Sequence, residues 1–274
     1  MNERIGFLGG GNMARALIAA LRRSGAAAST IAVGEPNAEV RAALTRDFGI
    51  ETHADNQRLI ADVGVLVLAV KPQDMARVLA PLRDGLAASK PLVISVAAGL
   101  RVADLARMLG ADLPIVRSMP NRPALTGAGA TGLYAPPSVG SEARQRAAGI
   151  LGVSGTVVWV DDESAMDVVT ALSGSGPAYF FLLAETLAAA AVAQGLDPDA
   201  AQRLAAATLH GAGTMAAEDS DVAGMREAVT SKGGTTEAAL QSLATANFAA
   251  TIKAAVTAAV ARSRELSDRY GASH

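Results

Sequence analysis

The sequence predicts an α/β domain with a doubly wound, parallel sheet, followed by an all-helical domain. Short runs rich in β-branched residues alternate with helical stretches over residues 4–160, and several runs are apolar throughout, as strands covered on both faces are. After Asp162 the chain becomes rich in alanine and offers no further strand candidate. We therefore expect a boundary near residue 162 and two domains, 1–162 and 163–274.

Alternation of strands and helices in the first domain predicts βαβ units, whose right-handed crossovers place helices on both faces of the sheet. Strands are expected at Arg4–Leu8, Thr30–Gly34, Val63–Ala69, Leu92–Val96, Ile115–Met119, Thr131–Ala135 and Val157–Val160. The helices expected between the early strands are Asn12–Ser24, Ala38–Phe48, Asp74–Leu86 and Val102–Leu109.

The second domain is helix-prone, with breaks at Ser173–Pro177, Gly195–Pro198 and Lys232–Gly234. Its most apolar segment, Ala178–Ala193, contains Glu185 and is shorter than the run of about 20 apolar residues that a bilayer requires. We expect this segment in a helical core or a subunit interface. The N-terminus has no pattern of a secretory signal, so we expect a soluble, cytoplasmic protein with no membrane partner.

The composition excludes several classes of function. The 274 residues include no cysteine, which removes disulfides, thiol catalysis and Cys-ligated metal sites. The three histidines show no ligand spacing, so we expect no metal site. The 24 Lys+Arg residues balance 26 Asp+Glu residues without a basic run, and only 3% of residues are aromatic, so we expect no nucleic-acid partner.

The first strand candidate leads into a glycine-rich turn. Gly9, Gly11 and Ala14 match the G-x-G-x-x-G/A pattern of Rossmann-like dinucleotide-binding domains. There the first glycine permits the turn, the second lets the pyrophosphate approach the backbone, and the helix N-terminus offers N–H groups to the phosphates. The alternative is a turn without a ligand. The position of this glycine pattern after an apolar strand near the N-terminus favours a dinucleotide-binding site over that alternative.

Glu35 ends the second strand candidate, where an acidic residue would bind the adenosine ribose hydroxyls and disfavour a 2′-phosphate. This position favours NADH over NADPH. The alternative is a solvated carboxylate in a turn, and Arg41, one helical turn away, would oppose the preference of Glu35. The sequence therefore leaves NADPH and NADH both open.

Two further segments directly follow predicted strands. In open α/β sheets, ligands bind at the carboxyl ends of the strands, so both segments are candidates for contact with the cofactor. Ala69-Val70-Lys71-Pro72 follows one of them, and Lys71 is either a phosphate or ribose ligand or a surface lysine. Ser95-Val96-Ala97-Ala98-Gly99 follows the next strand, where small residues would let a nicotinamide ring lie against the backbone.

The segment Ser231-Lys232-Gly233-Gly234-Thr235-Thr236 precedes a predicted helix. One of the two threonines would cap that helix, and the free N–H groups of the turn would form an anion nest suited to a substrate carboxylate. The Thr236 hydroxyl would then hydrogen-bond an adjacent nitrogen. The alternative is a capped turn without a ligand. The residues alone indicate a nicotinamide-dependent oxidoreductase whose substrate carries a carboxylate.

From Ile5 to Arg264 the chain resembles the pyrroline-5-carboxylate reductases, which reduce Δ1-pyrroline-5-carboxylate to L-proline. Five motifs in the right order and at the right separations carry this resemblance, and the most specific are Ser-Gly-Ser-Gly-Pro-Ala-Tyr at Ser173–Tyr179 and the Gly-Gly-Thr-Thr turn. The motifs are Gly9–Met13, Ala69–Pro72, Met119–Pro123 with Gly127-Ala128-Gly129, Ser173–Tyr179, and Thr230–Thr236.

The resemblance implies a helical domain that interlocks with its twin in a homodimer, and rings of five dimers in many members. It implies NADPH or NADH as cofactor, with Thr236 as the catalytic residue that orients the imine nitrogen. The implied cofactor positions are Leu8, Gly9, Gly10, Gly11, Asn12, Met13, Glu35, Asn56, Ala69, Val70, Lys71, Pro72, Ala97, Ala98 and Gly99. The implied substrate positions are Ser231, Gly233, Gly234, Thr235, Thr236 and a carboxylate at Glu218 or Asp219, of which we select Asp219.

Three positions depart from the family pattern. Lys232 replaces the usual proline of the Thr-Thr turn and adds a cation beside the expected carboxylate site. Arg122 replaces a threonine, and Glu35 stands where relatives often have small polar residues and accept NADPH. Two rival functions remain: a 3-hydroxyacid dehydrogenase, which would need a lysine absent from residues 164–194, and a dinucleotide-binding sensor without catalytic activity.

Overall fold

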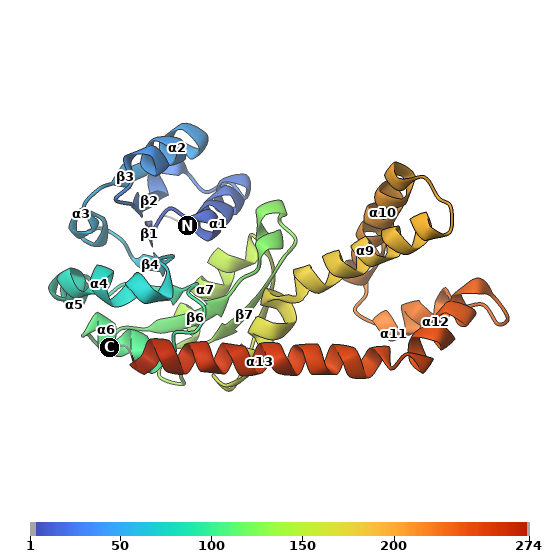
Figure 1. The fold of residues 1–274 in the computed structure, drawn as a ribbon. Helices are drawn as coiled ribbons and strands as arrows, with labels where there is room; N and C mark the ends of the chain where they lie inside the picture. The colour runs from blue at the N-terminus through green and yellow to red at the C-terminus, as the bar shows by residue number, and fades with distance from the viewer. Residues whose placement is uncertain (1–3, 273–274) are drawn as a thin grey trace. The chain divides into compact units, whose positions relative to one another are not determined.

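The computed structural model describes residues 4–272 of the chain (Figure 1). The chain divides into two compact units. The first contains the residues up to Ser175 together with those from Ala259 onward, and the second is Gly176–Ala258. The first unit thus ends at Ser175 rather than near residue 162, where we predict the boundary. The residues from Ala259 onward also belong to the first unit, whereas we predict them in the second domain.

The first unit is built on one eight-stranded sheet with strand order β3-β2-β1-β4-β5-β6-β7-β8. The strands pair in parallel except for β6 and β7, which are antiparallel. The order of the first six strands is that of a Rossmann fold, with its switch point between β1 and β4. The strands are β1 (Ile5–Leu8), β2 (Ile31–Gly34), β3 (Glu51–His53), β4 (Val65–Leu68), β5 (Leu92–Ser95), β6 (Ile115–Met119), β7 (Gly129–Tyr134) and β8 (Gly155–Trp159).

The predicted fold class is confirmed, with two corrections to the strands. The sequence reading missed β3, a three-residue edge strand whose residues Glu51, Thr52 and His53 lack the apolar run of a central strand. The antiparallel β7 makes the sheet mixed rather than wholly parallel. Short polar edge strands depend on pairing with a neighbour, here β2, and therefore leave little signal in the sequence.

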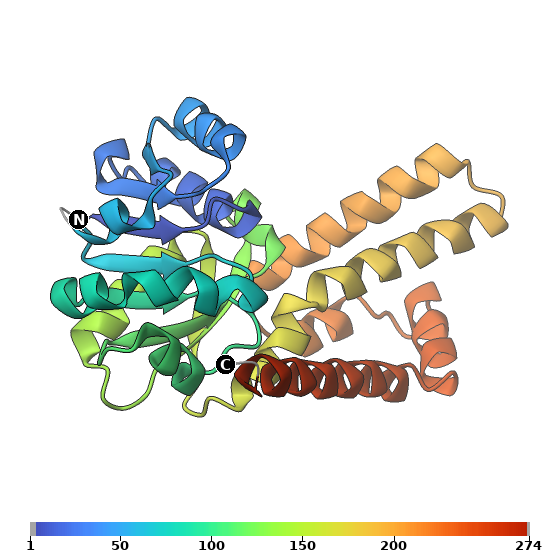
Figure 2. The ribbon, with the colours of Figure 1, turned by 60° about the vertical axis from the view of Figure 1, so that its left-hand side comes forward.

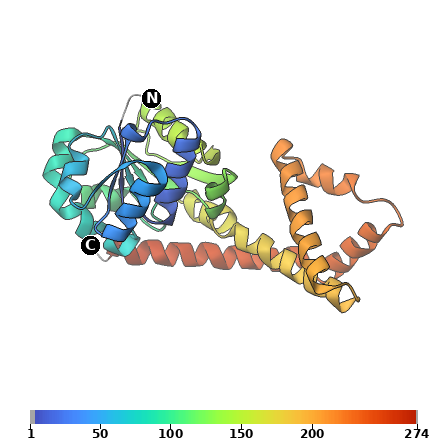
Figure 3. The ribbon, with the colours of Figure 1, turned by 90° about the horizontal axis from the view of Figure 1, so that it is seen from above.

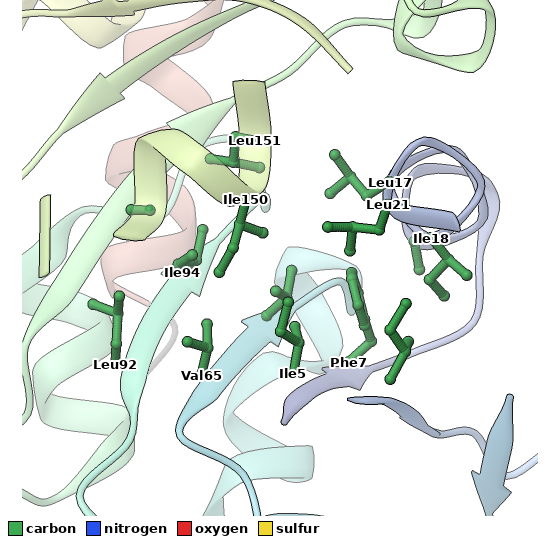
Figure 4. Close-up of a cluster of buried hydrophobic side chains, with 14 of the residues drawn as sticks. Ile5, Phe7, Leu17, Ile18, Leu21, Val65, Leu92, Ile94, Ile150 and Leu151 are labelled. Carbon is green, nitrogen blue, oxygen red and sulfur yellow. The ribbon is translucent and has the colours of Figure 1, made fainter. Parts of the chain in front are cut away.

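Helices cover both faces of the sheet (Figure 2). On one face, Leu17 and Leu21 of α1 and Ile150 of α7 pack on strand residues such as Phe7 and Ile94 (Figure 4). The opposite face carries a second buried cluster, from α3, α4, α5 and α6. The helices of these layers are α1 (Asn12–Arg23), α2 (Ala38–Phe48), α3 (Asn56–Ile60), α4 (Met75–Leu79), α5 (Arg83–Ser89), α6 (Val102–Leu109) and α7 (Ser141–Gly152).

The single helix predicted at Asp74–Leu86 is wrong, because the segment is broken. A 3-10 turn at Pro72–Asp74 precedes α4, and a second at Ala80–Leu82 separates α4 from α5. Pro81 has no N–H to continue the hydrogen-bond ladder of α4, and this accounts for the second break. The helices predicted at Ala38–Phe48 and Val102–Leu109 are found with the same bounds.

The second unit is helical, and its longest helices, α9 (Gly176–Ala193) and α10 (Pro198–Glu218), pack against each other (Figure 3). The short helices α11 (Val222–Ala228) and α12 (Thr235–Thr245) follow. The long α13 (Phe248–Ala272) begins in this unit and ends in the first. Breaks occur at Gly195 and before α12 as predicted, and a further one occurs at Asn247, which has a φ of 56°. At Ser173–Pro177, where we also predict a break, the chain passes through a π-helical turn and stays within the helical stretch Ala165–Ala193.

The apolar helix α9 is mostly exposed: Phe181 and Leu182 are 61% and 62% exposed. Together with α8 (Ala165–Val169) and the π-helical turn Thr170–Gly174, it forms a helical stretch over Ala165–Ala193 whose length and hydropathy suffice to cross a membrane. The argument from length against a span is therefore wrong. A single such stretch is weak evidence for a membrane, because apolar helices that pack against protein pass the same test.

Candidate active site

The cofactor residues inferred from sequence gather at one edge of the sheet. The turn after β1, the end of β2 and the segments after β4 and β5 all lie at carboxyl ends of neighbouring parallel strands. Backbone hydrogen bonds fix this edge: Gly9 N donates to Gly34 O at 2.8 Å, and Ala69 N donates to Leu8 O at 2.8 Å. Dinucleotides bind at this switch point in doubly wound sheets.

The glycines of the turn after β1 are needed for different structural reasons. Gly9 has a φ of +94°, and a Cβ there would lie 2.7 Å from the Ala69 carbonyl oxygen. Gly11 has an ordinary φ of −69°, and a Cβ there would meet no atom within 4 Å. Gly9 is thus required by the backbone, whereas Gly11 leaves open space at the exposed N-terminus of α1. This open space beside free N–H groups at a helix N-terminus would accommodate a pyrophosphate.

The Glu35 carboxylate is tied to the glycine turn. Its Oε2 accepts a hydrogen bond from Gly10 N at 2.9 Å, and its Oε1 accepts one from Asn37 N at 2.9 Å. Arg41 donates instead to the main-chain oxygens of Glu35 and Pro36, each at 2.7 Å. The carboxylate is therefore held in place by two N–H groups, and the Arg41 guanidinium does not pair with it.

Asn56 provides an independent sign of a ligand. Its Oδ1 is buried and has no hydrogen-bond partner, and it lies against the α-carbon side of Gly34, so closely that a Cβ at Gly34 would collide with it. Buried polar atoms without a partner are rare in native structures. The site at the end of β2 therefore fits the polar adenosine ribose of a dinucleotide, which would satisfy this oxygen.

The remaining cofactor positions differ in exposure. Lys71 is exposed at the start of the turn after β4, and within residues 4–272 its amino group forms no ion pair, so it is free to meet a phosphate. After β5, Ala98 is exposed, whereas Ala97 and Gly99 are buried. Leu8 and Gly10 are buried, Asn12 is exposed, and Met13, Ala69, Val70 and Pro72 are half-buried.

In the second unit, the predicted substrate turn forms the N-terminus of α12. Gly234 is the N-cap of this helix and has no side chain to satisfy the free N–H groups. The Thr236 hydroxyl makes no hydrogen bond within the described chain. By contrast, Thr186, Thr214, Thr230, Thr245, Thr251 and Thr257 each donate to the carbonyl four residues earlier. The residue four before Thr236 lies in the turn, which leaves this hydroxyl available to a ligand.

Glu237 is a residue that the sequence reading missed. Its Oε2 accepts a hydrogen bond from Gly233 N at 2.7 Å, so a carboxylate of the chain itself occupies part of the predicted anion nest. The spacing from the N-cap, Gly234, to Glu237 is that of a capping box, and this was the available signal. The turn therefore binds a carboxylate in this structure, and that carboxylate belongs to Glu237.

Asp219 is not brought to this turn by any hydrogen bond. It is exposed, follows the end of α10, and its Oδ1 accepts a hydrogen bond from Asp221 N at 3.0 Å. Its assignment to the substrate therefore stays a prediction. Ser231 O accepts a hydrogen bond from Gly234 N at 3.0 Å, and Lys232 is exposed on the turn.

The Met-Pro-Asn segment has a structural role that the sequence reading did not assign. The Asn121 side chain is 7% exposed, donates to Ser173 O at 2.9 Å, and accepts a hydrogen bond from Ala130 N at 2.9 Å. It thereby ties β7 to the π-helical turn Thr170–Gly174, and turns of this kind are frequent at functional sites. Within residues 4–272, no three His, Cys, Asp or Glu side chains gather closely enough to hold a metal ion.

Comparison with known proteins identifies the family to which the chain belongs. Residues 163–266 match a model of pyrroline-5-carboxylate reductase dimerisation domains, and residues 4–99 match a model described as NADP oxidoreductase, coenzyme F420-dependent. A pyrroline-5-carboxylate reductase of Pseudomonas aeruginosa is 43% identical over 269 residues, covering 98% of both chains.

Solved structures give the same result. A pyrroline-5-carboxylate reductase from Coxiella burnetii is 40% identical with a TM-score of 0.94, covering 97% of this chain and 99% of that one. The pyrroline carboxylate reductase of Plasmodium falciparum, solved with NADP bound, is 30% identical with a TM-score of 0.82, covering 97% and 98%. By full-length sequence identity and by fold, this chain belongs to the pyrroline-5-carboxylate reductase family.

Proposed function

We propose that this protein reduces Δ1-pyrroline-5-carboxylate to L-proline, the last step of proline biosynthesis, with NADPH or NADH as the hydride donor. The observation that carries the proposal is the 43% identity to a pyrroline-5-carboxylate reductase over 98% of both chains. The intact glycine turn after β1 and the unpartnered hydroxyl of Thr236 support it, since both parts of the expected machinery are present in the one chain.

The chain's own residues position the reactants rather than supply an acid. The nicotinamide, when bound, provides the hydride. The Thr235 amide binds the substrate carboxylate, joined by the Gly233 amide once Glu237 Oε2 releases it, and the Thr236 hydroxyl orients the imine nitrogen. A cyclic imine is basic enough to be partly protonated near neutral pH, so no histidine is needed. The main task is to hold the two reacting carbons at roughly 3–3.5 Å.

A single assay separates this function from its rivals. We expect the purified protein to oxidise NADH or NADPH when pyrroline-5-carboxylate is added, followed by the absorbance of the reduced nicotinamide. Oxidation of a 3-hydroxyacid with NAD⁺ or NADP⁺, and no reaction with the imine, would assign a dehydrogenase instead. Tight binding of a dinucleotide with no turnover of either substrate would assign a sensor.

We further propose that NADH is the preferred cofactor. The Glu35 carboxylate is held in place by the N–H groups of Gly10 and Asn37 at the end of β2, where a 2′-phosphate would meet a negative charge. Arg41 donates both of its short hydrogen bonds to backbone oxygens and offers this phosphate little compensation.

Replacing Glu35 with Ser is expected to raise the ratio of kcat/KM for NADPH over NADH by about tenfold or more, because the repelling charge is removed (1.4 kcal/mol per factor of ten). Steady-state rates with both cofactors measure this ratio. Glu35→Gln is the matched control: it keeps one acceptor for Gly10 N and loses only the charge, so it should raise the ratio as well. A wild-type protein that already prefers NADPH would contradict the proposal.

Glu237 gives a second expectation, because its carboxylate shares the turn with the substrate carboxylate. Glu237→Gln keeps an oxygen for Gly233 N but removes a like charge, and is expected to lower the KM for pyrroline-5-carboxylate by about fivefold, the effect of roughly 1 kcal/mol of repulsion. The KM for the cofactor should not change. An unchanged or higher KM for the imine would show that Glu237 only caps the helix.

We also propose that the protein is a homodimer, and that dimers assemble into rings of five. Supporting this, the matched family model is a dimerisation segment, and the groove between α9 and α10 is a cavity of about 710 Å³ lined mainly by apolar residues such as Phe181, Val192 and Leu209. Light scattering of the purified protein tests both levels of assembly. We propose a soluble, cytoplasmic location, in which the exposed apolar face of α9 is covered by the partner.

A further inference from the structure

The last turns of α13 pack against the loop that follows β5. Gly99 in this loop has a φ of +78°, and a Cβ there would lie 3.0 Å from Cδ2 and 3.3 Å from Cε2 of the Tyr270 ring. The ring of Tyr270 also packs against the buried cluster that contains Ala97 and Leu100. The aromatic ring therefore lies directly behind the loop, and no side chain fits between them.

Polar contacts hold the same end of α13 in place. Asp268 Oδ1 accepts a hydrogen bond from Arg101 at 2.5 Å, and Gly271 O accepts one from Arg107 at 2.9 Å. The hydrogen bond that Arg101 donates to Asp268 raises the pKa of the Arg101 guanidinium. These contacts all lie within the first unit and join residues that are more than 160 positions apart in the sequence.

Further along α13, the Ser263 hydroxyl donates to Asp167 Oδ1 at 2.6 Å, and these residues are 5% and 7% exposed. This buried contact secures the helix but does not touch the loop after β5. Loss of this contact should therefore lower the stability of the unit without moving the loop after β5, so that Ser263 can serve as a control position.

The first residues of the loop are held from within the sheet. Ala97 N donates to Ser95 Oγ at 3.3 Å, and the Ser118 hydroxyl donates to Ser95 O at 2.8 Å. Beyond Ala97, the loop exposes Ala98 on one side and buries Gly99 against Tyr270 on the other. Tyr270 thus supports the part of the loop that the sheet does not.

We propose that Tyr270 is a positioning residue, which sets the depth of the nicotinamide subsite by supporting the Ala97–Gly99 loop from behind. The inference rests on the proposed cofactor site and extends it to the end of the chain. Tyr270 itself does not touch the cofactor. Without the ring, the loop would move back toward the vacated space, and the nicotinamide would lose its support, while the adenosine end of the site, at Gly10, Glu35 and Asn56, would not change.

The test compares two ligands that share the adenosine end. In Tyr270→Ala, the Kd for NADH is expected to rise about tenfold and kcat to fall by a similar factor, because small displacements of a reacting group cost rates of this size or more. The Kd for ADP-ribose, which lacks the nicotinamide, should stay within about twofold of the wild-type value. Titration calorimetry measures both constants on the full-length protein, and Tyr270→Phe should restore wild-type behaviour.

Two further variants keep the outcome interpretable. Ser263→Ala removes the buried hydrogen bond to Asp167 and should lower Tm without changing the ratio of the two Kd values. Tyr270→Leu replaces Tyr270→Ala if the latter does not fold. Equal weakening of NADH and ADP-ribose, or no change in either, would overturn the proposal. Failure of the wild-type protein to reduce pyrroline-5-carboxylate would overturn the proposed function instead, because the binding experiment uses no imine.

Discussion

Thr236→Ala is expected to lower kcat by about 100-fold to 1000-fold, the usual cost of removing one hydrogen bond to the reacting group. The hydroxyl of Thr236 has no partner within the described chain, so its removal leaves no donor or acceptor of the protein unsatisfied. The fold should therefore keep its stability. Steady-state kinetics with pyrroline-5-carboxylate measure kcat, and the Kd for the cofactor, measured by titration, should not change.

Two neighbouring variants control this experiment. Thr236→Ser keeps a hydroxyl at the same position and should retain most of the activity. Thr235→Ala removes the hydroxyl of an exposed threonine on the same helical turn, and we assign only its backbone N–H to the substrate. It should therefore act far more weakly than Thr236→Ala. Equal turnover in Thr236→Ala and the wild type would remove Thr236 from the mechanism.

Gly9→Ala is expected to destabilise the protein by roughly 2–4 kcal/mol, because an alanine would be strained at a φ of +94° and its Cβ would collide with the Ala69 carbonyl oxygen. This cost corresponds to a fall in Tm of about 5–15 °C for a domain of this size. Thermal unfolding followed by circular dichroism measures it. The affinity for the cofactor should fall as well, because the collision displaces the turn that holds the pyrophosphate.

Gly11→Ala is the matched comparison, and its expected result is the opposite in stability. The φ of −69° suits alanine, and a Cβ there would meet no protein atom within 4 Å, so Tm should stay the same or rise slightly. The Kd for NADH should nevertheless rise by about tenfold or more, because the methyl group fills the space that the pyrophosphate needs. A Gly11→Ala protein that binds the cofactor normally would contradict the placement of the phosphates at this turn.

The fold could be predicted largely from the sequence because its strongest signals are local. Apolar runs such as Val65–Leu68 identify buried strands without knowledge of their neighbours, and the glycine turn marks the first strand–helix connection. The sequence did not reveal β3, whose polar residues depend on pairing with β2, nor the break at Pro81 within one long helical pattern. In both places, packing against neighbouring elements overrides the secondary structure that the local sequence prefers.

The site was predictable only where its function depends on the backbone. Glycine and threonine at fixed spacing indicated the turn after β1 and the turn before α12, where Gly9 and Gly233 have a positive φ that few other residues adopt. The partners of the side chains were not predictable. That Glu35 binds the Gly10 amide, and that Glu237 occupies the turn beside Thr236, depends on directions that a side chain takes only after the chain has folded.

The sequence by itself determined the alternation of strands and helices apart from β3, the positions of the two turns and the absence of thiol chemistry, because these follow from residue type and spacing along the chain. The tertiary structure alone decided which distant residues meet: Asn56 with Gly34, Asn121 with Ser173, and Tyr270 with Gly99. Such contacts are selected by the packing of whole layers, which no segment specifies on its own.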